Sequence, residues 1–329
     1  MTTVAVTGAG GFIAGAVLER LDADRAVDRI IGIDGVEPQM PVAKLDFRRA
    51  DIRDPLLPVA LDGADAVVHL GLTPGPMRAE DTMFAVNVSG TRNLLAAADK
   101  VGVGRLVHVS TAAVYGAHPD NVVPLTEDAP LRANPDFSWA YHHLLAEELV
   151  AAWAGDHPGV AVTVLRPVTV LGPGLRNFVA RHLEQPRLPL VRGSEPPVQL
   201  LGVDDLAAAV ALAVTGELSG AYNVAPDGWL PLRELARLLG KRPLELPESV
   251  AFAAAHRLWR HGLLDTPPGA LRYLMHPWVV STQRLHDAGW APTRSNREVV
   301  REFVAEHHGW LSLGRWRVRR RDAYAAVLL

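Results

Sequence analysis

The stretch that decides the fold lies at the beginning of the chain and reads Val4-Ala-Val-Thr-Gly-Ala-Gly-Gly-Phe-Ile-Ala14. A short β-branched run leads into a turn rich in glycine, and a helical pattern follows the turn. Gly8 permits a tight turn, and Gly10 and Gly11 let the backbone come close to a pyrophosphate. The pyrophosphate would lie on the N–H groups at the positive end of the helix. This stretch therefore predicts a strand, turn and helix that bind a dinucleotide.

The second predicted strand, residues 30–34, ends in Asp34. An acidic side chain at this point accepts hydrogen bonds from the hydroxyls of the adenosine ribose and repels a 2′-phosphate. The position of Asp34 therefore predicts NAD, rather than NADP, as the cofactor.

Short strands and helices alternate through the first half of the chain. We expect strands at residues 3–6, 30–34, 66–70, 106–110 and 161–165, and helices at residues 14–21, 81–101 and 140–154. Strands with few charges that are separated by helices form a parallel sheet covered on both faces. The pattern predicts an α/β fold of the Rossmann type, with a doubly wound parallel sheet.

The pattern changes after Gly172, where a smaller lobe of mixed structure is expected. We expect a proline-rich loop at residues 186–197, helices at 204–214 and 231–239, and a short strand at 222–224. Residues 1–170 are predicted to form the NAD-binding domain, together with a returning segment near 200–225. Residues 171–329 are predicted to form mainly the substrate-binding lobe and a C-terminal tail.

The composition excludes several classes of function. The 329 residues include no cysteine, so disulfides, a catalytic thiol and a thiolate metal site are excluded, and a reducing cytoplasm is the expected location. The net charge of −3 does not favour nucleic-acid binding. The thirteen histidines show no metal-binding spacing, so no metal site is expected. No apolar run has the length of a transmembrane helix, and no secretory signal is evident.

Motifs along most of the chain resemble, in the same order, those of the extended short-chain dehydrogenases/reductases, the NAD-dependent epimerase/dehydratase family. They are Thr7-Gly-Ala-Gly-Gly-Phe-Ile13, Asp51-Ile52, Val68-His-Leu-Gly71, Asn87-Val-Ser-Gly-Thr91, Val109-Ser-Thr-Ala-Ala-Val-Tyr-Gly116, Arg166-Pro167, Gly172-Pro-Gly174, Val203-Asp-Asp-Leu206 and Tyr222-Asn-Val-Ala225. Ala14 stands where the family usually has a third glycine. The resemblance implies an oxidoreductase that acts on a small molecule, and a homodimer formed through the helices beside the catalytic strand.

The resemblance also implies which residues contact the cofactor. They are Gly8, Gly11, Phe12, Ile13, Asp34, Asp51, Ile52, Leu70, Gly71, His143 and Pro167.

The catalytic pair of the family is absent from this chain. The family uses a tyrosine and a lysine four residues apart, together with a serine or threonine, and Thr111 fits the hydroxyl position. Counting back from Glu147, the acidic residue of the family's helix, puts His143 in the lysine position and Trp139 in the tyrosine position. Tryptophan has no proton that titrates in the usable pH range, whereas histidine can still donate or accept a hydrogen bond.

A second register would make Tyr141 the catalytic tyrosine, but Leu145 would then replace the lysine. Tyr141 is two residues from position 139, about 200° round a regular helix, so it would face the nicotinamide only if the helix began irregularly. We take Thr111, Tyr141 and His143 as the candidate catalytic residues. Two hypotheses remain: an enzyme with an atypical active site, or an inactive NAD-binding protein that acts as a sensor or interaction partner.

The second lobe gives weaker indications. Val198 stands where the family's nucleotide-sugar enzymes usually carry an arginine that grips the diphosphate, so a standard nucleotide sugar is not expected. Arg176 and Arg192 are the alternatives for that role, although Arg192 is more simply explained as a solvated loop charge. Leu200, Leu201 and the aromatic stretch 256–278 either line a less charged substrate pocket or form the core of the lobe, and we favour the core. The basic run 315–321 is a membrane or partner segment, or, as we favour, part of a C-terminal helix or a frayed end.

Overall fold

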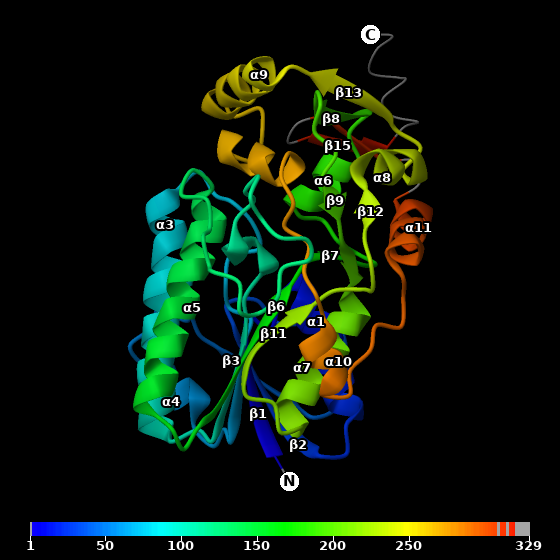
Figure 1. Cartoon of the computed structure of the whole chain (residues 1–329). Coiled ribbons are helices and arrows are strands. Elements are labelled where there is room, and N and C mark those ends of the chain that lie inside the picture. The colour runs from blue at the N-terminus through cyan, green and yellow to red at the C-terminus, as the bar shows by residue number, and fades with distance from the viewer. Residues whose placement is uncertain (1, 308–309, 314–315, 320–329) are drawn as a thin grey trace.

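A parallel sheet of seven strands forms the centre of the protein, which is described here by a computed structural model (Figure 1). The structure describes residues 2–307 and, for the backbone alone, 310–313 and 316–319. The strand order is β11-β6-β5-β4-β1-β2-β3, and every neighbouring pair is parallel. The strands are β1 (Thr2–Thr7), β2 (Val27–Asp34), β3 (Leu45–Arg49), β4 (Ala66–His69), β5 (Arg105–Val109), β6 (Ala161–Pro167) and β11 (Gly220–Val224). This order confirms the predicted doubly wound fold.

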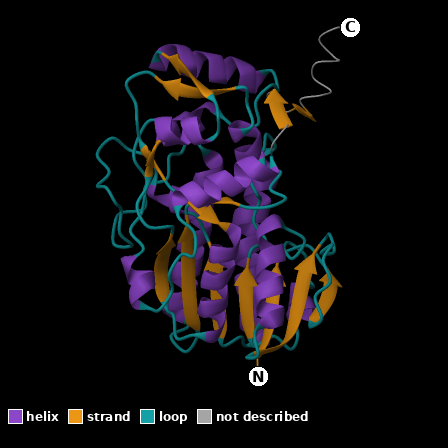
Figure 2. Ribbon diagram, turned by 90° about the vertical axis from the view of Figure 1, so that its right-hand side faces the viewer, coloured by secondary structure: helices purple, strands orange, loops and turns teal. Residues whose placement is uncertain are grey.

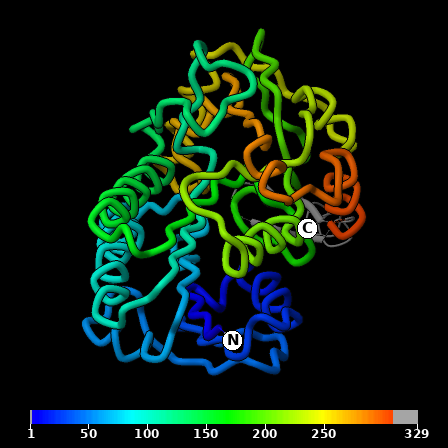
Figure 3. The backbone as a smooth tube through the Cα atoms, turned by 60° about the horizontal axis from the view of Figure 1, so that its bottom comes forward, coloured from blue at the N-terminus to red at the C-terminus, as the bar shows by residue number. Residues whose placement is uncertain are grey.

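Helices cover both faces of the sheet because its strands are apolar on both sides. One face is covered by α1 (Phe12–Ala23) and α7 (Val203–Thr215), and the other by α2 (Leu57–Leu61), α4 (Thr91–Val101) and α5 (Ser138–Asp156) (Figure 1). Figure 3 shows the blue N-terminal segment beside the yellow-green segment of α7, and the two helices are in contact. The chain therefore returns to the sheet at α7 and β11, after its first crossing into the second lobe.

The predicted helix at 81–101 has an irregular middle. It begins as α3 (Glu80–Phe84), continues as a π-helix, η1 (Ala85–Gly90), and ends as α4. π-helical segments are rare and often occur at functional sites. The irregular turn carries Asn87, whose side chain is fully buried beneath the loop that follows β4.

The second lobe lies beyond the C-terminal ends of the sheet strands (Figure 2). Its helical elements are α6 (Phe178–Leu183), α8 (Leu232–Leu238), α9 (Glu248–Arg260), η3 (Pro268–Leu274) and α11 (Asn296–Glu306). The short helix α10 (Gln283–Asp287) lies instead beside the sheet, in contact with β11 (Figure 1). Its strands pair as β7 (Thr169–Leu171) with β10 (Leu200–Gly202), β9 (Pro197–Val198) with β12 (Leu230–Pro231), and β8 (Arg187–Val191) with β13 (Arg242–Leu246). No helix in the described part of the chain has the length and apolar character needed to cross a membrane.

One prediction for this lobe is wrong, and one of the alternatives for the tail, a helix, is contradicted where the tail is described. Residues 186–197 are not simply a loop, because β8 lies within them and pairs in parallel with β13. Pro189 is tolerated there since a two-stranded sheet has only edge strands. Residues 310–319 are not helical where they are described: β14 (Trp310–Leu313) pairs with β15 (Trp316–Arg319) in an antiparallel arrangement. Residues 320–329 of the tail lie outside the described residues.

Candidate active site

The glycine turn between β1 and α1 has the shape that a pyrophosphate requires. Gly8 has a positive φ of 71°, and a Cβ atom there would lie 2.6 Å from the carbonyl oxygen of Leu70. A Cβ atom on Gly10 would lie 2.4 Å from the carbonyl oxygen of Val36. Gly11 is the N-cap of α1, and no side chain caps the N–H groups of that end. The turn thus leaves free donors at a positive helix end, which fits the diphosphate of NAD.

Asp34 lies at the end of β2, beside this turn. Its carboxylate accepts hydrogen bonds from the backbone N–H of Gly10, at 3.1 Å, and of Val36, at 3.0 Å. The side chain is only partly buried, so lone pairs remain for a ribose. This placement agrees with the role expected for Asp34, the recognition of the ribose hydroxyls.

We expect Asp34→Ala to weaken NAD binding by about 10–100-fold, because hydrogen bonds to a charged group are worth about 1.5–3 kcal/mol. The preference for NAD over NADP should fall, since the repulsion of the 2′-phosphate is also lost. Calorimetric titration with both cofactors measures the effect. The matched control is Asp28→Ala, which removes an exposed carboxylate from the same strand. Unchanged NAD binding, with NADP bound no better, would rule out this role for Asp34.

The other expected cofactor residues lie at the same edge of the sheet. Ile52 is buried under Gly71 and Gly90, where a Cβ atom on either glycine would touch its side chain. Asp51 forms a hydrogen-bonded ion pair with Arg53, at 2.6 Å, and this arginine lowers the pKa of Asp51.

Phe12, Ile13, Leu70 and Pro167 complete the set. Phe12 and Ile13 are the first two residues of α1, Leu70 directly follows β4, and Pro167 is the last residue of β6. Phe12 packs against the apolar core of the second lobe, whereas Ile13 packs against the core beneath the sheet. The structure thus places these residues, like the glycine turn, at the carboxyl ends of the strands, where doubly wound sheets bind their ligands.

A buried histidine, His69, connects the glycine turn to the π-helical segment. Thr91 donates its hydroxyl proton to the carbonyl oxygen of Asn87, so it accepts a hydrogen bond from Nε2 of His69, 3.0 Å away. Nδ1 of His69 must then accept a hydrogen bond from the hydroxyl of Thr7, 2.9 Å away. The oxygen of Thr7 in turn accepts the N–H of Gly71. Each polar atom in this series of hydrogen bonds has a partner, so the side chains at this edge of the site are held in place.

His143 lies on the buried side of α5, with 4% of its surface exposed. Its Nδ1 is 2.8 Å from the carbonyl oxygen of Trp139, which can only accept, so Nδ1 carries the proton. Burial lowers the pKa of His143 to about 4. At neutral pH the ring is therefore uncharged, and Nε2 carries a lone pair. Nε2 has no hydrogen-bond partner in the described part of the chain, and it is accessible to solvent.

Two further histidines share this region with His143. His69 and His108 face each other across β4 and β5, with ring centroids 5.2 Å apart, and both are fully buried. Burial, and then the proximity of His143, lower the pKa of His69 to about 3. Burial, His69 and His143 together lower the pKa of His108. Burial thus disfavours a positive charge on each of the three rings, so His143 differs in charge from the lysine ammonium of the family.

Trp139 has a structural partner that the sequence did not reveal. Its indole N–H donates to the carbonyl oxygen of Thr73, at 3.0 Å, in the loop that follows β4. The backbone N–H of Thr73 donates to the side chain of Asn87, at 2.8 Å. Because the backbone C=O and N–H groups of Thr73 are both hydrogen-bonded, the loop is held beside the site. The indole N–H is therefore not available as a proton donor to a substrate.

The structure separates the other two candidate catalytic residues. Thr111 is 9% exposed and lies two residues after the end of β5, where it is the N-cap of η2 (Ala112–Tyr115). The segment η2 is in contact with α5. The side-chain oxygen of Thr111 accepts the N–H of Ala113, so its hydroxyl proton is free to be donated. Tyr141 lies on the outer side of α5, with 37% of its surface exposed. The helix begins regularly at Ser138, so the structure does not bring Tyr141 to Thr111 and His143.

A buried ion pair between Glu147 and Arg166 stabilises the part of the site around His143. Glu147 lies one turn after His143 in α5, and its carboxylate accepts hydrogen bonds from Arg166 of β6, at 2.8 Å, and from Ser110, at 2.9 Å. Arg166 also donates to the hydroxyl of Tyr115, which donates to Asn223 of β11. Burial raises the pKa of Tyr115 to about 12, so this tyrosine acts in the network and not as an acid.

The substrate lobe has no cation at the position that grips a diphosphate in nucleotide-sugar enzymes. Val198 is buried in the apolar core of the lobe. Leu200 and Leu201 are also buried in apolar clusters, which favours their interpretation as core residues. Two aromatic side chains, Tyr273 and Trp278, pack against each other with ring centroids 5.4 Å apart.

Comparisons with known proteins agree with the fold and the cofactor turn. The model of the NAD dependent epimerase/dehydratase family matches residues 4–225. A 2-alkyl-3-oxoalkanoate reductase of Stenotrophomonas maltophilia is 29% identical over 328 residues, which cover 92% of this chain and 98% of the relative. An uncharacterized protein of Mycobacterium tuberculosis is 28% identical over 310 residues, which cover 91% of this chain and 82% of that protein. The UDP-glucose 4-epimerase of Thermus thermophilus, solved with NAD, is 25% identical with a TM-score of 0.73, covering 93% of this chain and 99% of the epimerase.

The chain belongs to the NAD-dependent epimerase/dehydratase family, the extended short-chain dehydrogenases/reductases. It is an NAD-binding protein of the oxidoreductase type, and the glycine turn of the structure fits that cofactor.

Proposed function

We propose that the protein is an NAD-dependent oxidoreductase that interconverts a secondary hydroxyl group and a carbonyl group, with His143 in place of the family's tyrosine as the proton-transfer residue. The observation that carries the proposal is the fixed tautomer of His143, in which Nδ1–H is bonded to Trp139 and Nε2 is left with a lone pair. A neutral imidazole of this kind is a general base at pH 7.

Two side chains would handle the substrate hydroxyl. Thr111 donates its free hydroxyl proton to the substrate oxygen and orients it, and Nε2 of His143 accepts the proton that leaves this oxygen. Bound NAD supplies the hydride acceptor. The pKa of His143, about 4, keeps the basic form dominant at neutral pH, and this is the form that oxidation of the alcohol requires. The reverse reduction requires the protonated ring and therefore acidic conditions.

The substrate is proposed to be a small molecule other than a standard nucleotide sugar. The buried Val198 supports this, because it leaves no cation at the family's diphosphate position. The similarity to a 2-alkyl-3-oxoalkanoate reductase suggests 2-alkyl-3-hydroxyalkanoates as first substrates. We further propose a homodimer in the cytoplasm, in line with the family and with the absence of cysteine.

A direct test is formation of NADH. The purified protein is first titrated with NAD in a calorimeter and then incubated with NAD and either a 2-alkyl-3-hydroxyalkanoate or UDP-glucose. We expect NAD binding, NADH formation with the hydroxyalkanoate, and none with the nucleotide sugar. Binding of NAD without turnover of a wide panel of secondary alcohols would contradict the proposal and favour the inactive, ligand-sensing alternative.

A further inference from the structure

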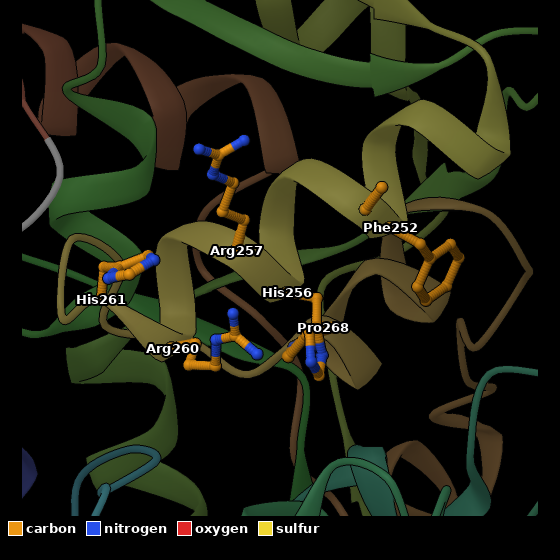
Figure 4. A pocket seen from close by; sticks show the side chains of 7 residues that line it. Phe252, His256, Arg257, Arg260, His261 and Pro268 are labelled. Carbon is orange, nitrogen blue, oxygen red and sulfur yellow. The ribbon is translucent and has the colours of Figure 1, made fainter.

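A hollow of about 630 Å³ lies on the second lobe, along α9 and the beginning of η3 (Figure 4). It is lined by Phe252, Ala253, His256, Arg257, Arg260, His261 and Pro268. None of these residues is acidic. Four of the seven carry nitrogen donors, and the other three offer an apolar surface.

The spacing of the four donors follows from the helix. His256 and Arg260 are four residues apart in α9, so they lie on the same side of the helix, and His261 follows as its C-cap. Figure 4 shows Arg260 and His256 turned toward Pro268, while Arg257 extends away from them. The hollow thus has a central pair of donors, Arg260 and His256, and a flanking cation.

These cations have no acidic partner in the part of the chain that the structure describes. No ion pair or hydrogen bond joins Arg257 or Arg260 to another side chain, although neighbouring arginines are paired: Arg272 with Asp136 at 2.8 Å, and Arg181 with Asp265. Two arginines at a spacing of three residues repel each other. The four side chains are exposed, so the cluster is open to an anion from outside the chain.

We propose that this hollow binds the phosphoryl group of a soluble organic phosphate, whose apolar part lies on Phe252 and Pro268. A guanidinium fork and imidazole N–H groups match phosphate oxygens in number and geometry. Arg257, which extends away from this pair, adds positive charge to the surface of α9 and not a further donor at the centre of the hollow. The site is distinct from the family's diphosphate position, which is occupied here by the buried Val198.

The helix that lines the hollow contacts the loop that passes the active site. Arg78, in the loop after β4, donates to the carbonyl oxygen of Trp259 in α9, and its guanidinium lies 4.3 Å from the centroid of that indole ring. The same loop is held at Thr73 by Trp139 and Asn87. A phosphate bound at Arg260 would therefore lie on α9, the helix that this loop contacts through Trp259.

The test uses phenyl phosphate as the probe, titrated into the full-length protein by calorimetry. We expect saturable binding that is weakened at least about tenfold by Arg260→Gln, since a charge-assisted hydrogen bond is lost. The control is Arg237→Gln, because Arg237 is also an exposed arginine in the last turn of a helix of this lobe but lies outside the hollow. This control should bind the probe within about twofold of the unchanged protein.

A second measurement uses the unchanged protein alone. Phenyl phosphate is expected to slow the modification of His256 and His261 by diethyl pyrocarbonate, followed by mass spectrometry, while phenol does not. Equal weakening by Arg237→Gln and Arg260→Gln, or no protection of the two histidines, would overturn the proposal. Binding to vesicles of phosphatidic acid without binding of phenyl phosphate would also overturn it, because it would assign the cluster to a lipid surface.

Discussion

Replacing His143 by alanine is expected to lower the rate of NAD-dependent alcohol oxidation by about two to four powers of ten, the usual contribution of a positioned acid–base group. The Nε2 lone pair of His143 would be lost, and the nearby groups cannot replace it. The indole N–H of Trp139 is bonded to Thr73, and Tyr141 faces solvent. The affinity for NAD should change much less than the turnover number. Single-turnover formation of NADH measures this separation.

The pH dependence of the same reaction gives an independent check. Since burial lowers the pKa of His143 to about 4, the base is unprotonated at neutral pH. Oxidation should then be level between pH 6 and 8, and should fall only as the pH approaches 4. Reduction needs the protonated ring, so its rate should fall about tenfold for each pH unit above the pKa. A single oxidation pKa near that of a free imidazole would contradict the buried, neutral ring.

Tyr141→Phe provides the matched control, because it alters a side chain of the same helix on its exposed side. Its activity should stay within about twofold of the unchanged protein. Free imidazole should restore part of the activity lost in His143→Ala, which a merely structural role of the ring would not explain. If Tyr141→Phe is the variant that abolishes turnover, the second register of the helix is the right one and His143 is not the base.

The period of the helix explains why the important residues of α5 could be predicted. Trp139, His143 and Glu147 recur every four residues, so one acidic position was enough to place the other two on the buried side. The glycine turn and Asp34 were predictable for a similar reason. A strand, a turn and a helix that are consecutive in the chain form the phosphate-binding turn, and Asp34 ends the strand that follows. Local spacing was sufficient in both cases.

Partners that are distant in the sequence could not be predicted. The indole of Trp139 is bonded to Thr73, 66 residues away, and the pairing of His69 with His108 depends on the register of two strands. The protonation states in the site depend on these contacts, because burial lowers the pKa of all three histidines. The strand β8 was missed because Pro189 favours a loop locally, while its partner β13 follows only after two further helices, α7 and α8.

The stability of the site should depend most on Glu147. We expect Glu147→Gln to lower the free energy of unfolding by about 3–5 kcal/mol, because it leaves the buried guanidinium of Arg166 without its counter-charge. Urea unfolding measures the change. Glu148→Gln, the adjacent exposed residue, should change stability by no more than about 0.5 kcal/mol.

Replacing both partners separates the cost of an unpaired charge from the value of the pair. The double change Glu147→Met with Arg166→Met should destabilise less than Glu147→Gln alone, because no buried charge is left without a partner. The same carboxylate joins α5 to β6 and to Ser110, one helical turn from His143. A double variant that regains stability but not NADH formation would show that the ion pair positions the base, since its stabilising role would then have been replaced. If Glu147→Gln unfolds at the same urea concentration as Glu148→Gln, the pair does not hold α5 against the sheet.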